Sequence, residues 1–136
     1  MDRALVAERL DALQRCVQRV SEKCPGTAEE LAADPDRQDI VALNLTRAVQ
    51  ICVDIASHML AESNLPPPST MAETFDALGV LGILEPSLRD RLKRAVGFRN
   101  IAVHEYQTID WHLVHRLCRE NLEDFRLFAK AVDARL

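Results

Sequence analysis

The chain has 136 residues, of which 48% are apolar and 28% charged, and its formal net charge is −4. This length suits one domain with a core, and the acidic balance argues against a protein that coats nucleic acid by charge alone. Charges interrupt every apolar run before the roughly 20 residues of a membrane span, and the segment Met1–Glu8 lacks a signal-peptide core. We therefore expect a single cytoplasmic domain over residues 1–136.

Apolar residues recur at spacings of three and four along most of the chain, which predicts an all-α fold of five helices in an up-and-down bundle. The first helix is expected to stop at Pro25 and Gly26. A polar stretch through residues 34–36 follows, and the second helix is expected from about Arg37 to Ala61. Its apolar stripe is wider than one buried face, which predicts packing against both its own core and a partner subunit.

Three more helices are expected after the stiff connector Pro66–Pro68. Thr70 and Glu73 have the spacing of a capping box and open a short third helix. The fourth helix starts at Pro86, and the last one runs unbroken from about residue 108 or 110 to the C-terminus. No window alternates with a period of two over a useful length, so no strand is predicted.

The end of the fourth helix carries polar side chains where a core would prefer leucine. At 100° per residue, Arg99 falls within the apolar stripe of this helix, where an unpaired guanidinium is costly. Asn100 and His104 are four residues apart and share the adjacent face. Two interpretations stay open: these side chains line a site, or Arg99 reaches an acid such as Glu105 or Asp110 while His104 caps the last helical carbonyls.

Metal-ligand patterns are weak in this sequence, so no metal and no cofactor are expected. The cysteines are scattered without a Cys-x-x-Cys pair, and they are interpreted as buried thiols: Cys16, Cys24, Cys52 and Cys118. His112 and His115 lie three apart on the last helix and are interpreted as surface histidines. His58 is interpreted as a satisfied core residue.

The order Arg99, four residues, His104, one residue and Tyr106 resembles the motif of the HEPN-domain ribonuclease toxins of the HepT/MntA toxin–antitoxin family. Asn100, directly after the arginine, fits the same motif. The likeness extends from about Asp36 onward. It includes Asp39–Met59 as the family's second helix and these positions of the later helices: Pro68, Phe75, Leu78, Asp124 and Phe128.

This resemblance implies a metal-independent endoribonuclease in which the RNA 2′-hydroxyl attacks its own phosphate and leaves a cyclic phosphate end. His104 would be the acid/base group and Arg99 would stabilise the phosphate charge, with Asn100 counted among the catalytic residues. One histidine does not easily serve both sides of a phosphate. The family's homodimers, which place two motifs across one cleft, therefore suit this chemistry.

The resemblance also implies a partner: an MntA-type minimal nucleotidyltransferase antitoxin that transfers AMP from ATP to Tyr106, the single tyrosine of the chain. Bulk and negative charge would then fill the RNA site of this type VII toxin. A basic run is either a set of RNA phosphate contacts or a solvated helix face: Arg89, Arg91, Lys93 and Arg94. A non-catalytic helical binding module, or an antitoxin partner of the nucleotidyltransferase, is the alternative function.

Overall fold

The computed structural model describes residues 2–136, and these residues form seven α-helices and one 3₁₀ turn, with no strand among them. The predicted all-α class is confirmed. The elements are α1 (Arg3–Lys23), α2 (Ala28–Ala32), α3 (Pro35–Leu60), α4 (Met71–Val80), α5 (Pro86–His104), η1 (Tyr106–Thr108), α6 (Trp111–Glu120) and α7 (Leu122–Asp133).

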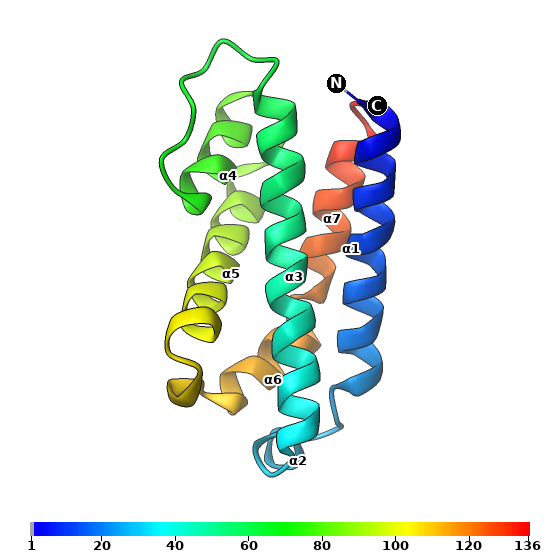
Figure 1. Cartoon of the computed structure of the whole chain (residues 1–136), viewed down its shortest axis with the longest axis vertical. Coiled ribbons are helices and arrows are strands. Elements are labelled where there is room, and N and C mark those ends of the chain that lie inside the picture. Colours follow the sequence, from blue (N-terminus) through cyan, green and yellow to red (C-terminus); the bar gives the residue numbers. More distant parts are fainter. Residues whose placement is uncertain (1) are drawn as a thin grey trace.

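The long helices alternate in direction, as Figure 1 shows. Helix α1 runs away from the two termini, α3 returns, α5 runs away again, and α6 with α7 leads back, so both termini lie at one end. This order agrees with the predicted up-and-down bundle. The last residues of α5, the turn η1 and the start of α6 come together at the opposite end, beside the first turns of α3.

The predicted count of five helices is wrong, for two local reasons. The polar stretch after Gly26 contains the short helix α2, whose first turn is capped by the Thr27 side chain accepting from the Glu30 N–H at 3.2 Å. The last predicted helix is broken at Asn121, which adopts φ −119° and ψ 1°. The Asn121 side chain donates to Asp124 across this break at 3.1 Å, so a polar contact holds the joint between α6 and α7.

The predicted helix boundaries agree with the structure where capping signals are strong. The Thr70 hydroxyl accepts from the Glu73 N–H at 3.2 Å, as expected for a capping box. The Glu73 carboxylate returns to the N–H of Ser69 at 2.8 Å, one residue before the cap. Asp34, which was expected to lie in a polar stretch, caps α3 through the N–H groups of Asp36 and Arg37, so this helix begins at Pro35, two residues before the expected start at about Arg37.

Helix α3 is the centre of the bundle and contacts α1, α2, α4, α5 and α7. Its wide apolar stripe is therefore explained by neighbours within the chain, and its buried residues join the same core as the perpendicular ring pair Phe75 and Phe128. The expectation that no stretch approaches a membrane span is wrong for α3. By length and composition alone, this helix is long and apolar enough to cross a membrane, although 56% of its most apolar window is buried inside the protein.

The cysteines lie inside the bundle as free thiols. Cys16, Cys52 and Cys118 are buried and Cys24 is half-buried, so the interpretation as buried thiols is confirmed for three of them. Burial raises the pKa of the Cys16, Cys52 and Cys118 thiols, which keeps them protonated and unreactive at neutral pH.

Candidate active site

The candidate site is built on the last turns of α5 and on the turn that follows. The apolar positions Leu88, Leu92 and Val96 are buried at spacings of four and fix the rotation of the helix. Arg99 follows Val96 by three residues, so this orientation brings its side chain to the edge of the core, where it is half-buried. His104 is the last residue of α5 and is exposed.

The Arg99 guanidinium has no anionic partner among the described residues. Its Nε atom is buried without a hydrogen bond, and its terminal nitrogen donates to the Asn100 side-chain oxygen at 3.2 Å. A buried, unsatisfied donor on a cation is costly, because the charge has lost water without gaining an acceptor. The group is thus available to an incoming anion, and Asn100 holds one end of its donor fork.

Within residues 2–136, Arg99 and His104 do not make the structural contacts that the sequence left open. Arg99 forms no ion pair with Glu105 or Asp110, and the His104 ring makes no hydrogen bond to a helical carbonyl there. The helix is closed instead by the Glu105 N–H, which donates to the Ile101 carbonyl at 2.8 Å. Within the described residues, Arg99 therefore has no acidic partner and His104 does not cap the helix, so both side chains remain available at the end of α5.

Tyr106 lies directly beyond the helix end, where Glu105 leaves helical geometry with φ −141° and ψ 46°. Its ring packs edge-on against Trp111, with the ring centroids 5.8 Å apart. Its hydroxyl donates to the Asp39 carboxylate of α3 at 2.5 Å. Burial, and then the Asp39 carboxylate, raises the pKa of Tyr106, so the phenol is protonated at neutral pH.

Asp39 is the neighbour that sequence reasoning missed as a site residue. It lies 67 residues before Tyr106, and no local spacing joins the two positions. The contact arises because α3 and α5 run antiparallel, which brings the start of one helix beside the end of the other (Figure 1).

The predicted basic run of α5 is divided by ion pairs. Lys93 and Arg89 both approach Asp76 of α4, at 2.9 Å and 3.9 Å, and Arg89 also contacts Asp90 at 3.1 Å. Arg91 pairs with the buried Asp124 at 2.8 Å. Arg94 has no ion pair in the described chain, so it is the member of the run that is fully available to a phosphate.

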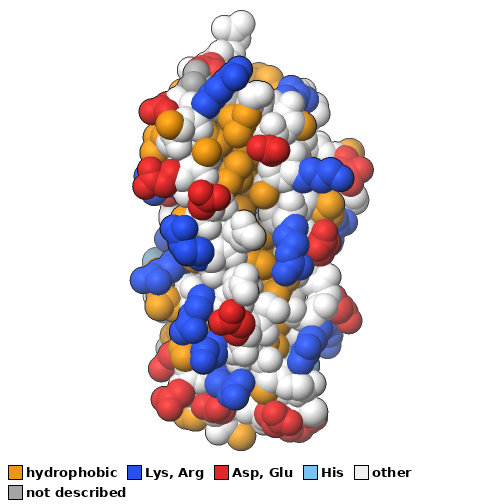
Figure 2. Space-filling model, turned by 90° about the vertical axis from the view of Figure 1, so that its right-hand side faces the viewer, with side chains coloured by type: hydrophobic (Ala, Val, Ile, Leu, Met, Phe, Trp, Pro, Cys, Tyr) orange, Lys and Arg blue, Asp and Glu red, His pale blue; other side chains and the backbone are white. Residues whose placement is uncertain are grey.

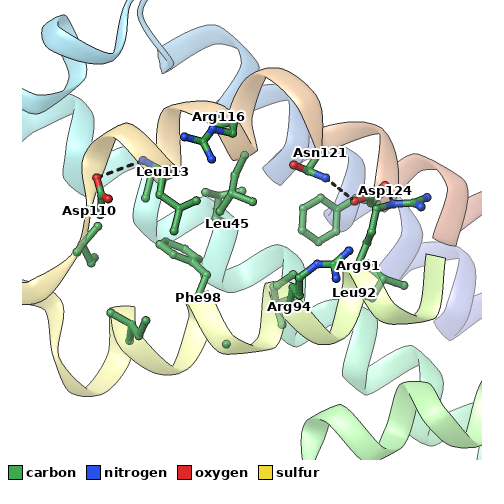
Figure 3. Close-up of a pocket in the computed structure, with 18 of the residues that line it drawn as sticks. Leu45, Arg91, Leu92, Arg94, Phe98, Asp110, Leu113, Arg116, Asn121 and Asp124 are labelled. Carbon is green, nitrogen blue, oxygen red and sulfur yellow. Dashed lines mark hydrogen bonds and ion pairs between the residues drawn. The ribbon is translucent and has the colours of Figure 1, made fainter. Parts of the chain in front are cut away.

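Arg94 opens onto a cavity of about 490 Å³ between α5 and α6, with α3 at its back. Figure 3 shows Phe98, Leu113 and Leu45 projecting into this space, with Arg94 and Arg116 reaching it from opposite helices. The walls are mostly apolar, and Arg99, His104 and Tyr106 are outside the lining. The cavity therefore adjoins the candidate site without containing its chemistry.

A second cationic surface was not predicted from the sequence. An open groove of about 600 Å³ between α1 and α3 is flanked by Arg15, Arg19 and Arg47, which form no ion pairs among the described residues. Figure 2 shows the face that includes α1, where Lys and Arg side chains gather around the middle and acids lie more toward the ends. Because the three arginines come from separate turns and helices, no basic run in the sequence predicted this surface.

The remaining histidines have structural contacts or lie on the surface. His115 is half-buried and its ring Nε2 donates to the Pro25 carbonyl at 2.9 Å, which corrects its interpretation as a surface histidine. His112 is exposed, and the half-buried His58 accepts from the Asp2 N–H at 3.3 Å. Over residues 2–136, no group of three or more potential metal-ligating side chains is brought together.

The whole fold is similar to that of solved toxin structures. A solved structure of the tri-AMPylated Shewanella oneidensis HEPN toxin in complex with MNT antitoxin is 32% identical, with a TM-score of 0.90. The match covers 98% of this chain and 99% of that one. The fold is thus of the all-helical HEPN type.

Sequence comparisons narrow the assignment. The family model Ribonuclease HepT-like matches residues 10–132. The mRNA nuclease HepT of Shewanella oneidensis is 32% identical over 130 residues, which span 96% of this chain and 97% of that protein. The tRNA nuclease HepT of Aphanizomenon flos-aquae is 25% identical over 132 residues, 97% of this chain and 90% of that one. The chain belongs to the HepT-like ribonuclease family, which confirms the predicted family and the endoribonuclease class.

Proposed function

We propose that this chain is the toxin of a type VII HepT/MntA toxin–antitoxin pair: a metal-independent, homodimeric endoribonuclease of the cytoplasm, formed by one HEPN domain over residues 1–136. The observation that supports it most strongly is Arg99, whose buried Nε has no acceptor and whose guanidinium has no anion. A phosphate at this position would satisfy both needs at once. A purely structural module has no reason to keep such a cation there.

The proposed reaction is attack of the RNA 2′-hydroxyl on the adjacent phosphorus. His104 takes the proton of the attacking hydroxyl or gives one to the departing 5′-oxygen, since an imidazole exchanges protons near neutral pH. Arg99 donates to the equatorial oxygens as charge builds on them, and Asn100 keeps the guanidinium oriented through the 3.2 Å contact. The product is a 2′,3′-cyclic phosphate.

Two motifs are required if acid and base stand on opposite sides of the phosphate. A second copy of the chain would supply the second His104, and this chemical need is the argument for the homodimer. Arg94, which forms no ion pair among the described residues, is the most available RNA contact of the predicted basic run. Arg89, Arg91 and Lys93 would first have to leave the carboxylates of Asp76 and Asp124.

Inactivation is proposed to occur by AMP transfer from ATP to Tyr106, catalysed by an MntA-type nucleotidyltransferase antitoxin. Tyr106 follows His104 by two residues, and 37% of its surface is exposed, so an enzyme can reach its hydroxyl. The Shewanella toxin in the solved complex carries AMP and is bound to an MNT antitoxin, which supports the same partner here. The added phosphate would compete for Arg99.

The test is expression of the chain without an antitoxin, compared with His104→Ala and with the matched variant His112→Ala. His112 is an exposed histidine on α6 outside the motif. Growth arrest and RNA breakdown by wild type and His112→Ala, but not by His104→Ala, would support the proposal. Harmless expression of all three, each folded and at equal level, would instead favour the binding-module function.

A further inference from the structure

Tyr106 is a neutral phenol, hydrogen-bonded to a carboxylate, in the chain without a bound nucleotide. Its hydroxyl donates to Asp39 Oδ1, and its ring edge is set against Trp111. The phenol is neutral at physiological pH, because burial and the nearby carboxylate raise its pKa. A neutral phenol is a poor nucleophile toward phosphorus, so its proton has to leave as the new bond forms.

Asp39 is placed to receive that proton. Its carboxylate lies on the second turn of α3, is exposed, and forms no ion pair with any cation in the described chain. Other ionisable groups near these helix ends include Asp36 and Arg37 of α3, Arg99, His104 and Glu105 at the end of α5, and Asp110 and His112 at the start of α6. None of these hydrogen-bonds to the Tyr106 hydroxyl.

We propose that Asp39 is the general base for nucleotidyl transfer to Tyr106, so that the toxin contributes a catalytic group to its own inactivation. The proposal rests on the AMP-acceptor role of Tyr106 described above. The bond from Tyr106 Oη to the α-phosphorus of ATP forms, and the bond from that phosphorus to the pyrophosphate oxygen breaks. The Oη proton passes to Asp39 Oδ1 and from there to water, and pyrophosphate leaves.

The same hydrogen bond orients the acceptor. The carboxylate fixes the Tyr106 hydroxyl from the side of α3, and Trp111 limits rotation of the ring from the side of α6. A general base within hydrogen-bond reach of the proton that it removes typically accelerates transfer by about 10²- to 10⁴-fold. The geometry here fulfils this distance requirement before the antitoxin binds.

The experiment measures AMP transfer from ATP to the purified chain by its antitoxin, with intact-mass detection, at saturating ATP and as a function of pH. Asp39→Asn keeps the shape of the side chain and removes the base, and Asp39→Glu restores a carboxylate. Asp36→Asn is the matched control: it removes the same charge one turn earlier on α3, from an exposed side chain without a hydrogen bond to Tyr106. Circular dichroism and thermal unfolding confirm that each variant is folded.

We expect Asp39→Asn to slow transfer by about 100-fold with little change in KM for ATP, Asp39→Glu to recover part of the rate, and Asp36→Asn to equal wild type. The Asp39→Asn rate should rise about tenfold per pH unit, because hydroxide then removes the proton, while wild type changes much less. Transfer by Asp39→Asn within twofold of wild type would overturn the inference. A slower rate with an unchanged pH profile would also overturn it, since the contact would then only position the ring.

Failure of the underlying function gives a different result. If wild type accepts no AMP, or if Tyr106→Phe is labelled as fast as wild type, the acceptor role itself is wrong and the inference falls with it. Labelling of wild type at Tyr106 that is insensitive to Asp39 contradicts the inference alone.

Discussion

At the scale of single residues, Arg99 combines a folding cost with a proposed chemical use. Its half-buried guanidinium has lost water at Nε and has gained one neutral contact, to Asn100. Protein interiors normally pair such a charge or replace it with an apolar residue. The proposed anion-binding role would account for its presence at the end of an otherwise apolar stripe, and it predicts that replacing Arg99 changes stability and activity in opposite directions.

Replacement of Arg99 by leucine tests this opposition. Arg99→Leu should raise the free energy of unfolding by about 1 kcal/mol, because it removes a buried unsatisfied donor. The same change should lower RNA cleavage by about 100-fold or more, because the phosphorane charge loses its main donor. Urea unfolding and single-turnover cleavage measure the two effects. The matched variant Arg99→Lys should lower cleavage without the gain in stability, and a destabilised Arg99→Leu would contradict this account.

At the scale of elements, the joint between α6 and α7 depends on one buried carboxylate. Asp124 accepts from Arg91 of α5 at 2.8 Å and from Asn121 at 3.1 Å, so three helices meet at its side chain. Asp124→Ala should lower the free energy of unfolding by about 2–3 kcal/mol, because two hydrogen bonds are lost and a partly buried arginine is left unpaired. Thermal or urea unfolding measures this loss of stability.

The neighbouring Glu123 is the control for that prediction. Its ion pair with Arg126 is 3.3 Å long, but the side chains are 60% and 55% exposed. Glu123→Ala should therefore change stability by less than about 0.5 kcal/mol. Equal effects of Glu123→Ala and Asp124→Ala would show that the joint has no special role.

The cap of α4 gives a smaller, local prediction. Thr70→Ala removes the side-chain acceptor of the Glu73 N–H and should cost about 1 kcal/mol of unfolding free energy. Ser69→Ala, one residue earlier, should be nearly neutral because Ser69 contributes its backbone N–H to the cap. A neutral Thr70→Ala in urea unfolding would contradict the role of this hydroxyl.

Sequence patterns predicted the elements that have strong periodicity and strong caps. The starts of α4 and α5 carry Thr70 and Pro86, and these signals act within one helical turn. The short α2 was missed because five residues give no measurable period, and the break at Asn121 was missed because the apolar period continues across it. Arg99, Asn100, His104 and Tyr106 could be predicted as site residues because they are close in sequence.

Contacts between distant segments were beyond the reach of those patterns. The acceptor of the Tyr106 hydroxyl depends on the antiparallel packing of α3 and α5, and the carboxylates that occupy Arg89, Arg91 and Lys93 come from α4 and α7 as well as α5. Whether a basic run is free or paired is decided by these tertiary neighbours, so sequence alone left both interpretations open.

At the scale of the whole molecule, the proposed reaction requires two chains. If the second His104 comes from a partner subunit, mixed dimers of wild type and His104→Ala should be nearly inactive. Subunits exchanged at rising proportions of the variant should then show cleavage per wild-type chain falling in proportion to the wild-type fraction. Constant cleavage per wild-type chain, in a sample shown to exchange, would contradict the two-histidine mechanism. Light scattering on the same samples measures the molar mass and so shows whether the chain is a dimer.

The chemistry of the RNA ends tests the central claim most directly. Total RNA incubated with the purified chain in excess EDTA should acquire new 2′,3′-cyclic phosphate ends, and the His104→Ala protein, purified in the same way, should produce none. Cleavage under these conditions is predicted because the proposed route uses Arg99 and His104 in place of a metal ion. Cleavage that stops in EDTA, or that leaves 3′-hydroxyl ends, would contradict the account.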